Sequence, residues 1–161
     1  MELAIFFHDW IYNPQGKDNE VESIKCFEEF ATESNLSEPL AGRVSEYVGC
    51  TITHTLPSRD GDAGGEPDGD LCLFLDFDLE VLSRSDADYS LYAARIRQEY
   101  GHFAEADYCA GRIKVLGTFL DRERLYFSTL FHEMYEKIAR ENLRAEIAML
   151  EGKLRDLKEA S

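Results

Sequence analysis

The longest periodic stretch of the chain is the feature that most limits its fold. Between about residues 128 and 158, large aliphatic side chains recur four and three positions apart, at Leu143, Ile147, Leu150, Leu154 and Leu157. This is the spacing of the a and d positions of a helix that buries one stripe. The stretch therefore predicts a long C-terminal helix. Fewer than three heptads are present, so the stripe either packs on its own domain or pairs with another chain, and both readings stay open.

The rest of the chain also has helical spacing, and no segment shows the alternation of a half-buried strand. We expect helices over residues 1–12, from Asp18 or Asn19 onward, after Ser37, over 71–82, from Asp88 to Tyr100, and over 105–119. The first of these is nearly all apolar, which predicts burial on most sides. Residues 13–16 have turn composition, and the glycine-, proline- and acid-rich segment 55–70 predicts a surface loop. The fold class is all-α.

Charge and cysteine content limit the partners and the compartment. The net charge is −15, and residues 121–161 account for only −1 of it, so residues 1–120 carry −14. Such a field repels nucleic acid and anionic membranes, and no apolar run approaches the roughly 18 residues of a membrane span. Four widely spaced cysteines predict buried, unpaired thiols rather than a zinc or redox motif. With no targeting segment visible, we expect the cytoplasm or a reducing organelle matrix.

Several histidines and aspartates stand where a purely apolar side chain would be expected. His8 and Asp9 interrupt an apolar run, and Asp76 and Asp78 interrupt another. Burying such groups is costly unless they are paired, and a divalent cation or a hydrogen-bonded polar pair would serve equally well. His54 comes just before the acidic loop and is a further candidate ligand.

These residues belong to motifs that together resemble the HD superfamily of metal-dependent phosphohydrolases. The resemblance runs through residues 7–14 (FHDWIYNP), 18–20 (DNE), 53–54 (TH), 74–79 (FLDFDL), 96–100 (IRQEY), 111–112 (GR) and 139–143 (ARENL). It implies an HD-domain-like helical bundle over residues 1–145, with 146–161 as an extension of the C-terminal helix. Each motif is short, and the order and spacing of all of them carry the resemblance.

The family holds its metal with a first His, then a His-Asp pair, then a distal Asp. Carried over, His8 and Asp9 look like the pair and Asp78 like the distal ligand, with Asp76 as the alternative. The resemblance places the first His on a helix before the one that holds His8, and that helix is absent here. We therefore expect either a truncated sequence or a lost ligand, with His54 as the candidate to replace it. The metal would be Mn, Fe, Ni, Co, Zn or Mg, since His and carboxylate ligands suit all of them to differing degrees.

The implied chemistry is hydrolysis of a phosphate ester by a metal-activated water. Glu20 is the candidate to orient or deprotonate that water, although an acid in a first helical turn is also favoured by the helix dipole alone. Arg97 and Arg112, and less so Lys114, are candidates to neutralise the phosphate. Ion pairs with the acid-rich surface explain these cations equally well.

Two functions follow as hypotheses. The first is a metal-dependent phosphohydrolase acting on a small phosphorylated metabolite, with a nucleotide favoured. The alternative is a catalytically inactive HD-fold subunit with a structural or interaction role in a larger assembly. An apolar surface including Leu3, Ile5, Phe6, Phe7 and Trp10, together with the C-terminal stripe, predicts self-association or a protein partner.

Overall fold

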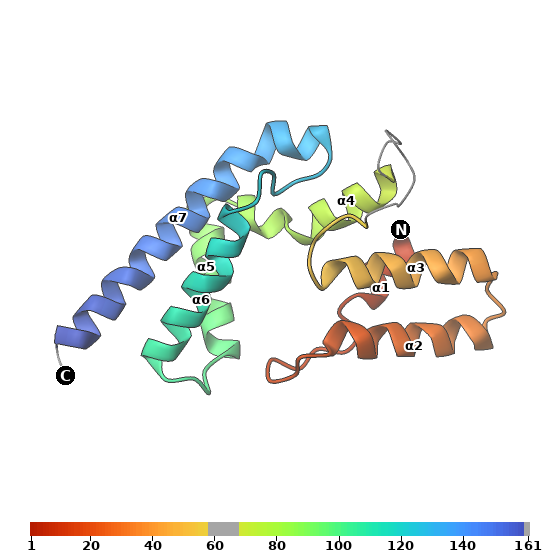
Figure 1. The fold of residues 1–161 in the computed structure, drawn as a ribbon, viewed down its shortest axis with the longest axis horizontal. Helices are drawn as coiled ribbons and strands as arrows, with labels where there is room; N and C mark the ends of the chain where they lie inside the picture. The colour runs from red at the N-terminus through yellow and green to blue at the C-terminus, as the bar shows by residue number, and fades with distance from the viewer. Residues whose placement is uncertain (58–67, 160–161) are drawn as a thin grey trace. The chain divides into compact units, whose positions relative to one another are not determined.

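The computed structural model describes residues 1–57 and 68–159. Within these ranges all regular secondary structure is helical, so the all-α prediction is confirmed (Figure 1). The chain divides into two compact units, an N-terminal unit of Met1–Phe77 and a C-terminal unit of Asp78–Ser161. In the described ranges, no helix combines the length and the apolar character needed to cross a membrane. Most of the predicted surface loop, residues 58–67, lies outside the described residues.

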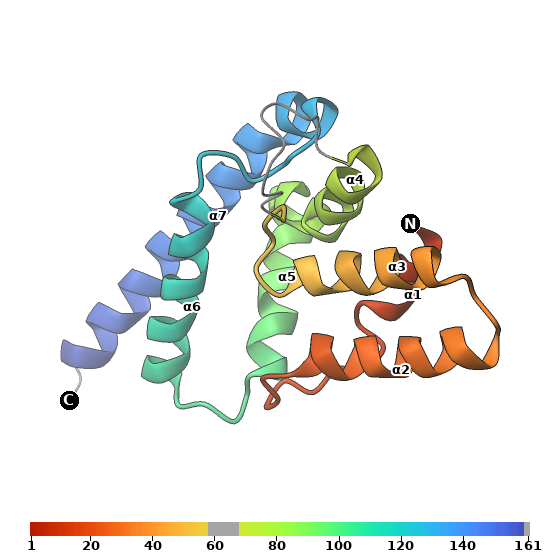
Figure 2. The same cartoon turned by 45° about the vertical axis from the view of Figure 1, so that its right-hand side comes forward.

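The described residues of the N-terminal unit form four helices, the last of which ends one residue beyond the unit. They are α1 (Glu2–Phe7), α2 (Asn19–Glu33), α3 (Glu38–Thr51) and α4 (Gly69–Asp78). Figures 1 and 2 both show α2 and α3 side by side. The turn between them contains Asn35 at φ 51°, a left-handed conformation that asparagine tolerates better than most residues. The predicted start of α3 is confirmed, with Ser37 as its N-cap and a proline in the first turn.

Aromatic side chains form the centre of this unit. Phe27, Tyr47 and Phe74 are 0%, 1% and 2% exposed, and the rings of Tyr47 and Phe74 stack 5.9 Å apart. The Tyr47 hydroxyl donates a 2.7 Å hydrogen bond to Asp68, whose other carboxylate oxygen accepts from the Asp70 backbone at the start of α4. Burial and the bond to Asp68 raise the pKa of Tyr47. This bond ties the start of α4 to α3.

The first helix differs from the prediction in length and burial. It ends at Phe7 rather than near residue 12, and only Ala4 and Phe7 of its residues are buried, whereas Ile5 is 47% and Phe6 61% exposed. A helix of six residues can turn only one face towards the neighbouring α2 and α3. Its other apolar side chains therefore remain on the surface, and the predicted burial on most sides was wrong.

Hydrogen bonds hold the chain between α1 and α2 in place. Gly16 donates to the Asn13 carbonyl at 2.8 Å, which confirms the predicted turn. Asn13 and Asn19 bond to each other reciprocally, backbone to side chain, at 2.9 and 3.0 Å. The Ile11 backbone N–H donates to the hydroxyl of buried Ser23 on α2. These bonds fix the path of the chain just after His8 and Asp9.

The C-terminal unit consists of a short 3₁₀ helix, η1 (Glu80–Ser83), followed by α5 (Asp86–Glu99), α6 (Glu105–Leu120) and α7 (Thr129–Glu159). The single helix predicted over residues 71–82 is thus divided into α4 and η1. The break falls at Leu79, whose carbonyl accepts a 3.0 Å hydrogen bond from the buried Tyr126 hydroxyl. The cap of α5 is Ser85 rather than the predicted Asp88, because the Ser85 hydroxyl accepts from the Asp88 backbone and donates to its carboxylate.

The long C-terminal helix is present as predicted, and it packs against α6. Of its stripe, Leu143 and Leu150 are 0% and 2% exposed, while Leu157 is 37% exposed. The first part of the stripe therefore belongs to the core of its own unit. The division into 1–145 and 146–161, which the family resemblance implied, falls inside α7 and stays a prediction.

The four cysteines are free thiols, in agreement with the prediction. Cys72 and Cys109 are buried, and burial raises the pKa of both thiols, which keeps them protonated and unreactive. Cys26 and Cys50 are only half-buried, so the expectation that all four are buried was wrong for these two.

Candidate functional site

His8 and Asp9 follow the end of α1, where the helix geometry fixes the imidazole. His8 Nδ1 lies 2.9 Å from the Ile5 carbonyl oxygen. A carbonyl can only accept, so Nδ1 carries a proton and Nε2 is the atom directed at Asp9. The two side chains approach at 3.4 Å between Nε2 and Oδ2, and they are 21% and 64% exposed. The His8 ring also meets the Phe74 ring of α4 edge-on at 5.8 Å.

The separation of this pair would allow both side chains to bind one metal ion. Nitrogen and oxygen ligands about 2.0–2.2 Å from a common ion stand roughly 3.0–3.5 Å apart at tetrahedral or octahedral angles. The observed 3.4 Å falls in that range and is long for a direct hydrogen bond. A second nitrogen that donates to a backbone carbonyl is the usual arrangement of a metal-binding histidine. The pair therefore fits a divalent cation.

The remaining predicted ligands complete no coordination sphere. Asp76 is fully buried within α4, Asp78 is the last residue of that helix and half-buried, and His54 lies half-buried beyond α3 with φ 47°. Over residues 1–57 and 68–159, no group of three or more His, Cys, Asp or Glu side chains could hold a metal ion. The metal site of His8, Asp9, Asp78 and His54 therefore stays a prediction.

On α4, Phe74 and Asp78 are four residues apart and so share one helix face, whereas Asp76 is turned away from that face. The face that bears Phe74 is the one that meets the His8 ring. The choice between Asp78 and Asp76 as the distal ligand stays a prediction, because Asp78 and His8 belong to different compact units. Glu20 lies half-buried in the first turn of α2, the position that the helix dipole favours for an acid.

Arg97, a predicted phosphate ligand, forms hydrogen bonds and an ion pair within the C-terminal unit. Its guanidinium donates to Glu105 at 3.0 and 2.8 Å and to the carbonyls of Tyr100 and Phe103. It also lies 4.6 Å from the Tyr108 ring centroid. Hydrogen bonding to Arg97 lowers the pKa of Glu105. These contacts fasten the turn between α5 and α6, so Arg97 has a structural role whether or not it also meets a phosphate.

Arg112 forms a still more enclosed pair. It donates to Glu146 of α7 at 2.8 and 3.2 Å, and Tyr89 of α5 donates to the same carboxylate at 2.5 Å. The side chains of Arg112 and Glu146 are 11% and 3% exposed. Burial lowers the pKa of Arg112, but the hydrogen bonds and charge of Glu146 outweigh it and raise the pKa overall. This cluster links all three long helices of the unit. Lys114, the weaker candidate, is exposed on α6.

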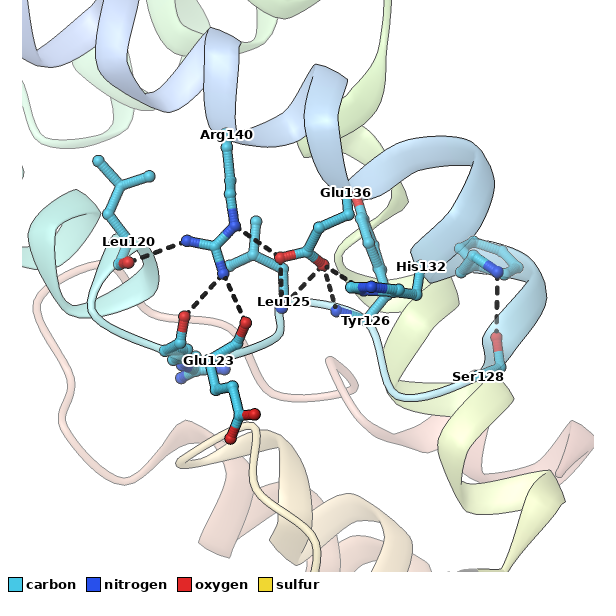
Figure 3. A network of polar contacts seen from close by, with 10 residues as sticks. Leu120, Glu123, Leu125, Tyr126, Ser128, His132, Glu136 and Arg140 are labelled. Carbon is cyan, nitrogen blue, oxygen red and sulfur yellow. Dashed lines mark hydrogen bonds and ion pairs between the residues drawn. The ribbon is translucent and has the colours of Figure 1, made fainter.

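A second buried charge cluster was missed by the sequence reasoning. Figure 3 shows Glu136 on α7 accepting from the backbone N–H groups of Leu125 and Tyr126, at 2.9–3.2 Å, and from Arg140 at 2.6 Å. Arg140 in turn donates to the carbonyls of Leu120, Arg122 and Glu123. The network holds the loop between α6 and α7. Its only sequence signal is the spacing of Glu136 and Arg140 by four residues.

A cavity of about 550 Å³ lies in the C-terminal unit, between α5 and α7. Small side chains, including Ala93, Ala94 and Ala145, line it together with Tyr89 and Glu146. Among its lining residues only Arg97 was a predicted site residue, and nothing in the spacing of the others indicates a binding site.

The described residues thus form an all-α protein in which His8 and Asp9 lie next to each other after the end of α1. Comparison with protein-family models, curated proteins and solved structures finds no match to this chain. The family assignment therefore continues to depend on the motifs.

Proposed function

We propose that the chain is an HD-type metal-dependent phosphohydrolase that acts on a small phosphorylated metabolite, with a nucleotide as the favoured substrate. The observation that carries the proposal is the His8–Asp9 pair, with Nε2 and Oδ2 3.4 Å apart and Nδ1 held by a carbonyl. The charge of −14 on residues 1–120 agrees with it, because a phosphorylated substrate needs a bound cation or a local basic group to approach so acidic a chain.

The roles proposed for individual residues differ in how many observations support them. When bound, the metal would supply Lewis-acid activation of water and of the phosphoryl group. His8 and Asp9 would hold it, with Asp78 as the further family ligand. Glu20 would orient the water. Arg97, whose side chain is 28% exposed, is better suited to meet a phosphate than Arg112 at 11%.

The second candidate function is a catalytically inactive HD-fold subunit. Two observations favour it: the described residues supply no third metal ligand, and both arginines form ion pairs with glutamates. In such a subunit the His8–Asp9 pair would be a remnant, and the exposed apolar side chains of α1 would serve assembly.

Titration with Co²⁺ tests the first function directly, because cobalt reports nitrogen and oxygen ligation through its visible absorption. We expect the chain to bind Co²⁺, and Asp9→Asn to weaken binding at least about tenfold. Asp121→Asn, an equally conservative change at an exposed position, should leave binding unchanged. A panel of nucleotides and sugar phosphates with Mn²⁺, Co²⁺, Zn²⁺ or Mg²⁺ then tests hydrolysis.

No Co²⁺ binding, or equal binding by Asp9→Asn and the parent chain, would contradict the metal site. Binding without hydrolysis of any phosphate ester would favour the inactive subunit.

A further inference from the structure

Four aromatic side chains of the N-terminal unit form one contiguous cluster. Phe6, Phe7 and Trp10 lie with their ring centroids 5.2–5.5 Å apart, and Phe30 of α2 lies 5.3 Å from Phe7. Only Phe7 is buried; Phe6, Trp10 and Phe30 are 61%, 51% and 38% exposed. A single exposed apolar side chain needs no explanation, but a contiguous exposed patch usually marks an interface.

The cluster lines a hollow between α1 and α2 with a volume of about 540 Å³, which we call the aromatic groove. Its lining consists of Leu3, Phe6, Phe7, Trp10, Cys26, Glu29, Phe30 and Glu33. The last four follow one face of α2 at three- and four-residue spacing. None of these eight residues, all within the described part of the chain, is a lysine or arginine. The groove is thus an aromatic surface bordered by two carboxylates one helical turn apart.

We propose that the aromatic groove binds an amphipathic helix of a protein partner, with lysine or arginine beside its apolar stripe. Apolar side chains at positions i, i+4 and i+7 of such a helix would cover Phe6, Trp10 and Phe30. Basic side chains one turn apart would match the spacing of Glu29 and Glu33.

The carboxylates of Glu29 and Glu33 disfavour two other occupants of the groove, a second copy of the chain and an anionic membrane. A second copy in a two-fold symmetric contact through this face would bring the Glu29 and Glu33 of both copies together, and like charges oppose that pairing. An anionic membrane surface meets the same repulsion. A basic amphipathic helix is complementary to both the aromatic side chains and the two carboxylates of the groove.

Trp10 provides the measurement, because it is the only tryptophan of the chain and lies in the groove. The probes are two synthetic helical peptides with identical leucines at i, i+4 and i+7, and with either lysine or glutamate at the flanking positions. We expect the lysine peptide to shift Trp10 emission to shorter wavelength and to bind at least about tenfold more tightly than the glutamate peptide.

The double variant Glu29→Lys/Glu33→Lys should reverse this preference. Glu38→Lys/Glu46→Lys makes the same charge change at exposed positions of α3 and should retain the preference for lysine. Phe6→Ala should weaken binding of the lysine peptide without unfolding the chain, because Phe6 is 61% exposed.

Three results would overturn the proposal. One is no change in Trp10 emission with either peptide up to about 1 mM. Another is equal binding of both peptides. The third is a concentration-dependent dimer in sedimentation that shields Trp10 without peptide, which would assign the groove to a second copy.

Discussion

The Arg112–Glu146 cluster and the His8–Asp9 pair each bring a carboxylate close to a basic side chain, but they differ in burial and in the separation of their atoms. In the C-terminal unit, the Glu146 carboxylate accepts three hydrogen bonds and is 3% exposed. In the N-terminal unit, His8 and Asp9 approach only to 3.4 Å, and the Asp9 side chain is 64% exposed. The first arrangement holds helices together, whereas the second places most of the Asp9 side chain at the surface.

Burial and hydrogen bonding therefore distinguish charged residues that hold the fold together from candidate functional ones better than residue type does. A buried pair contributes to folding only while both partners and their hydrogen bonds are present, since either charge alone is costly to bury. An exposed pair contributes little to folding, so its removal should affect binding far more than stability.

The largest expected effect is the loss of the Glu146 carboxylate. Glu146→Ala leaves the Arg112 charge buried without its partner and removes the acceptor of the Tyr89 hydroxyl. We expect the free energy of unfolding to fall by about 3–5 kcal/mol, measured by urea denaturation. Glu151→Ala, an exposed glutamate on the same helix, should change it by less than about 0.5 kcal/mol. A loss below about 1 kcal/mol for Glu146→Ala would show that the cluster is less important than its burial suggests.

A smaller effect should appear as a pH dependence at Glu136. Burial alone would raise its pKa, but Arg140 and the two backbone donors outweigh burial and lower the pKa below the ordinary 4.5. A lowered folded-state pKa means that the ionised group stabilises the fold above about pH 4.5, and that this contribution is lost as the pH falls. The stability difference between the parent chain and Glu136→Gln should therefore shrink from about pH 5 towards pH 3.

Glu133→Gln provides the control, because Glu133 is exposed on the same helix. Its stability should stay within about 0.5 kcal/mol of the parent chain throughout this pH range. A difference for Glu136→Gln that does not change with pH would mean that the Glu136 carboxylate titrates alike in the folded and unfolded chains.

The smallest expected effect on stability is at the proposed metal pair. Asp9→Asn should change the free energy of unfolding by less than about 0.5 kcal/mol, because the carboxylate is largely exposed. Thermal unfolding without added metal measures this change. A loss above about 2 kcal/mol would make Asp9 a structural residue and would remove the contrast with Glu146.

Much of the fold was predictable because helix spacing is a local property. The starts of α2 and α3 and the length of α7 all follow from residues that are close in sequence. The break after α4 was not predictable, since the Leu79 carbonyl accepts from Tyr126, 47 positions away. The early end of α1 was missed for a related reason: its apolar residues indicate a helix but not how many of its faces the neighbours can cover.

The site was predictable only in part. A histidine and an aspartate inside an apolar run are conspicuous, so His8 and Asp9 were found. Arg112 was noticed as a cation, but its partner Glu146 is 34 positions away, and no local pattern joins them. Glu136 and Arg140 were overlooked because charges four apart on a helix usually lie on a solvated face.

The length of α7 has a consequence for how the chain unfolds. Its 31 residues extend over roughly 46 Å, and Leu150 is the last of them that is buried. From residue 151 to 159 no residue of the helix is buried, and the 3.6 Å ion pair of Lys153 with Glu105 of α6 joins two partly exposed side chains. Such a pair adds little to backbone bonds that in water are marginal for so short a segment. One continuous helix therefore contains two thermodynamic parts. The first opens only when the whole unit does, and the second frays on its own, so amide exchange along α7 should change sharply near Leu150.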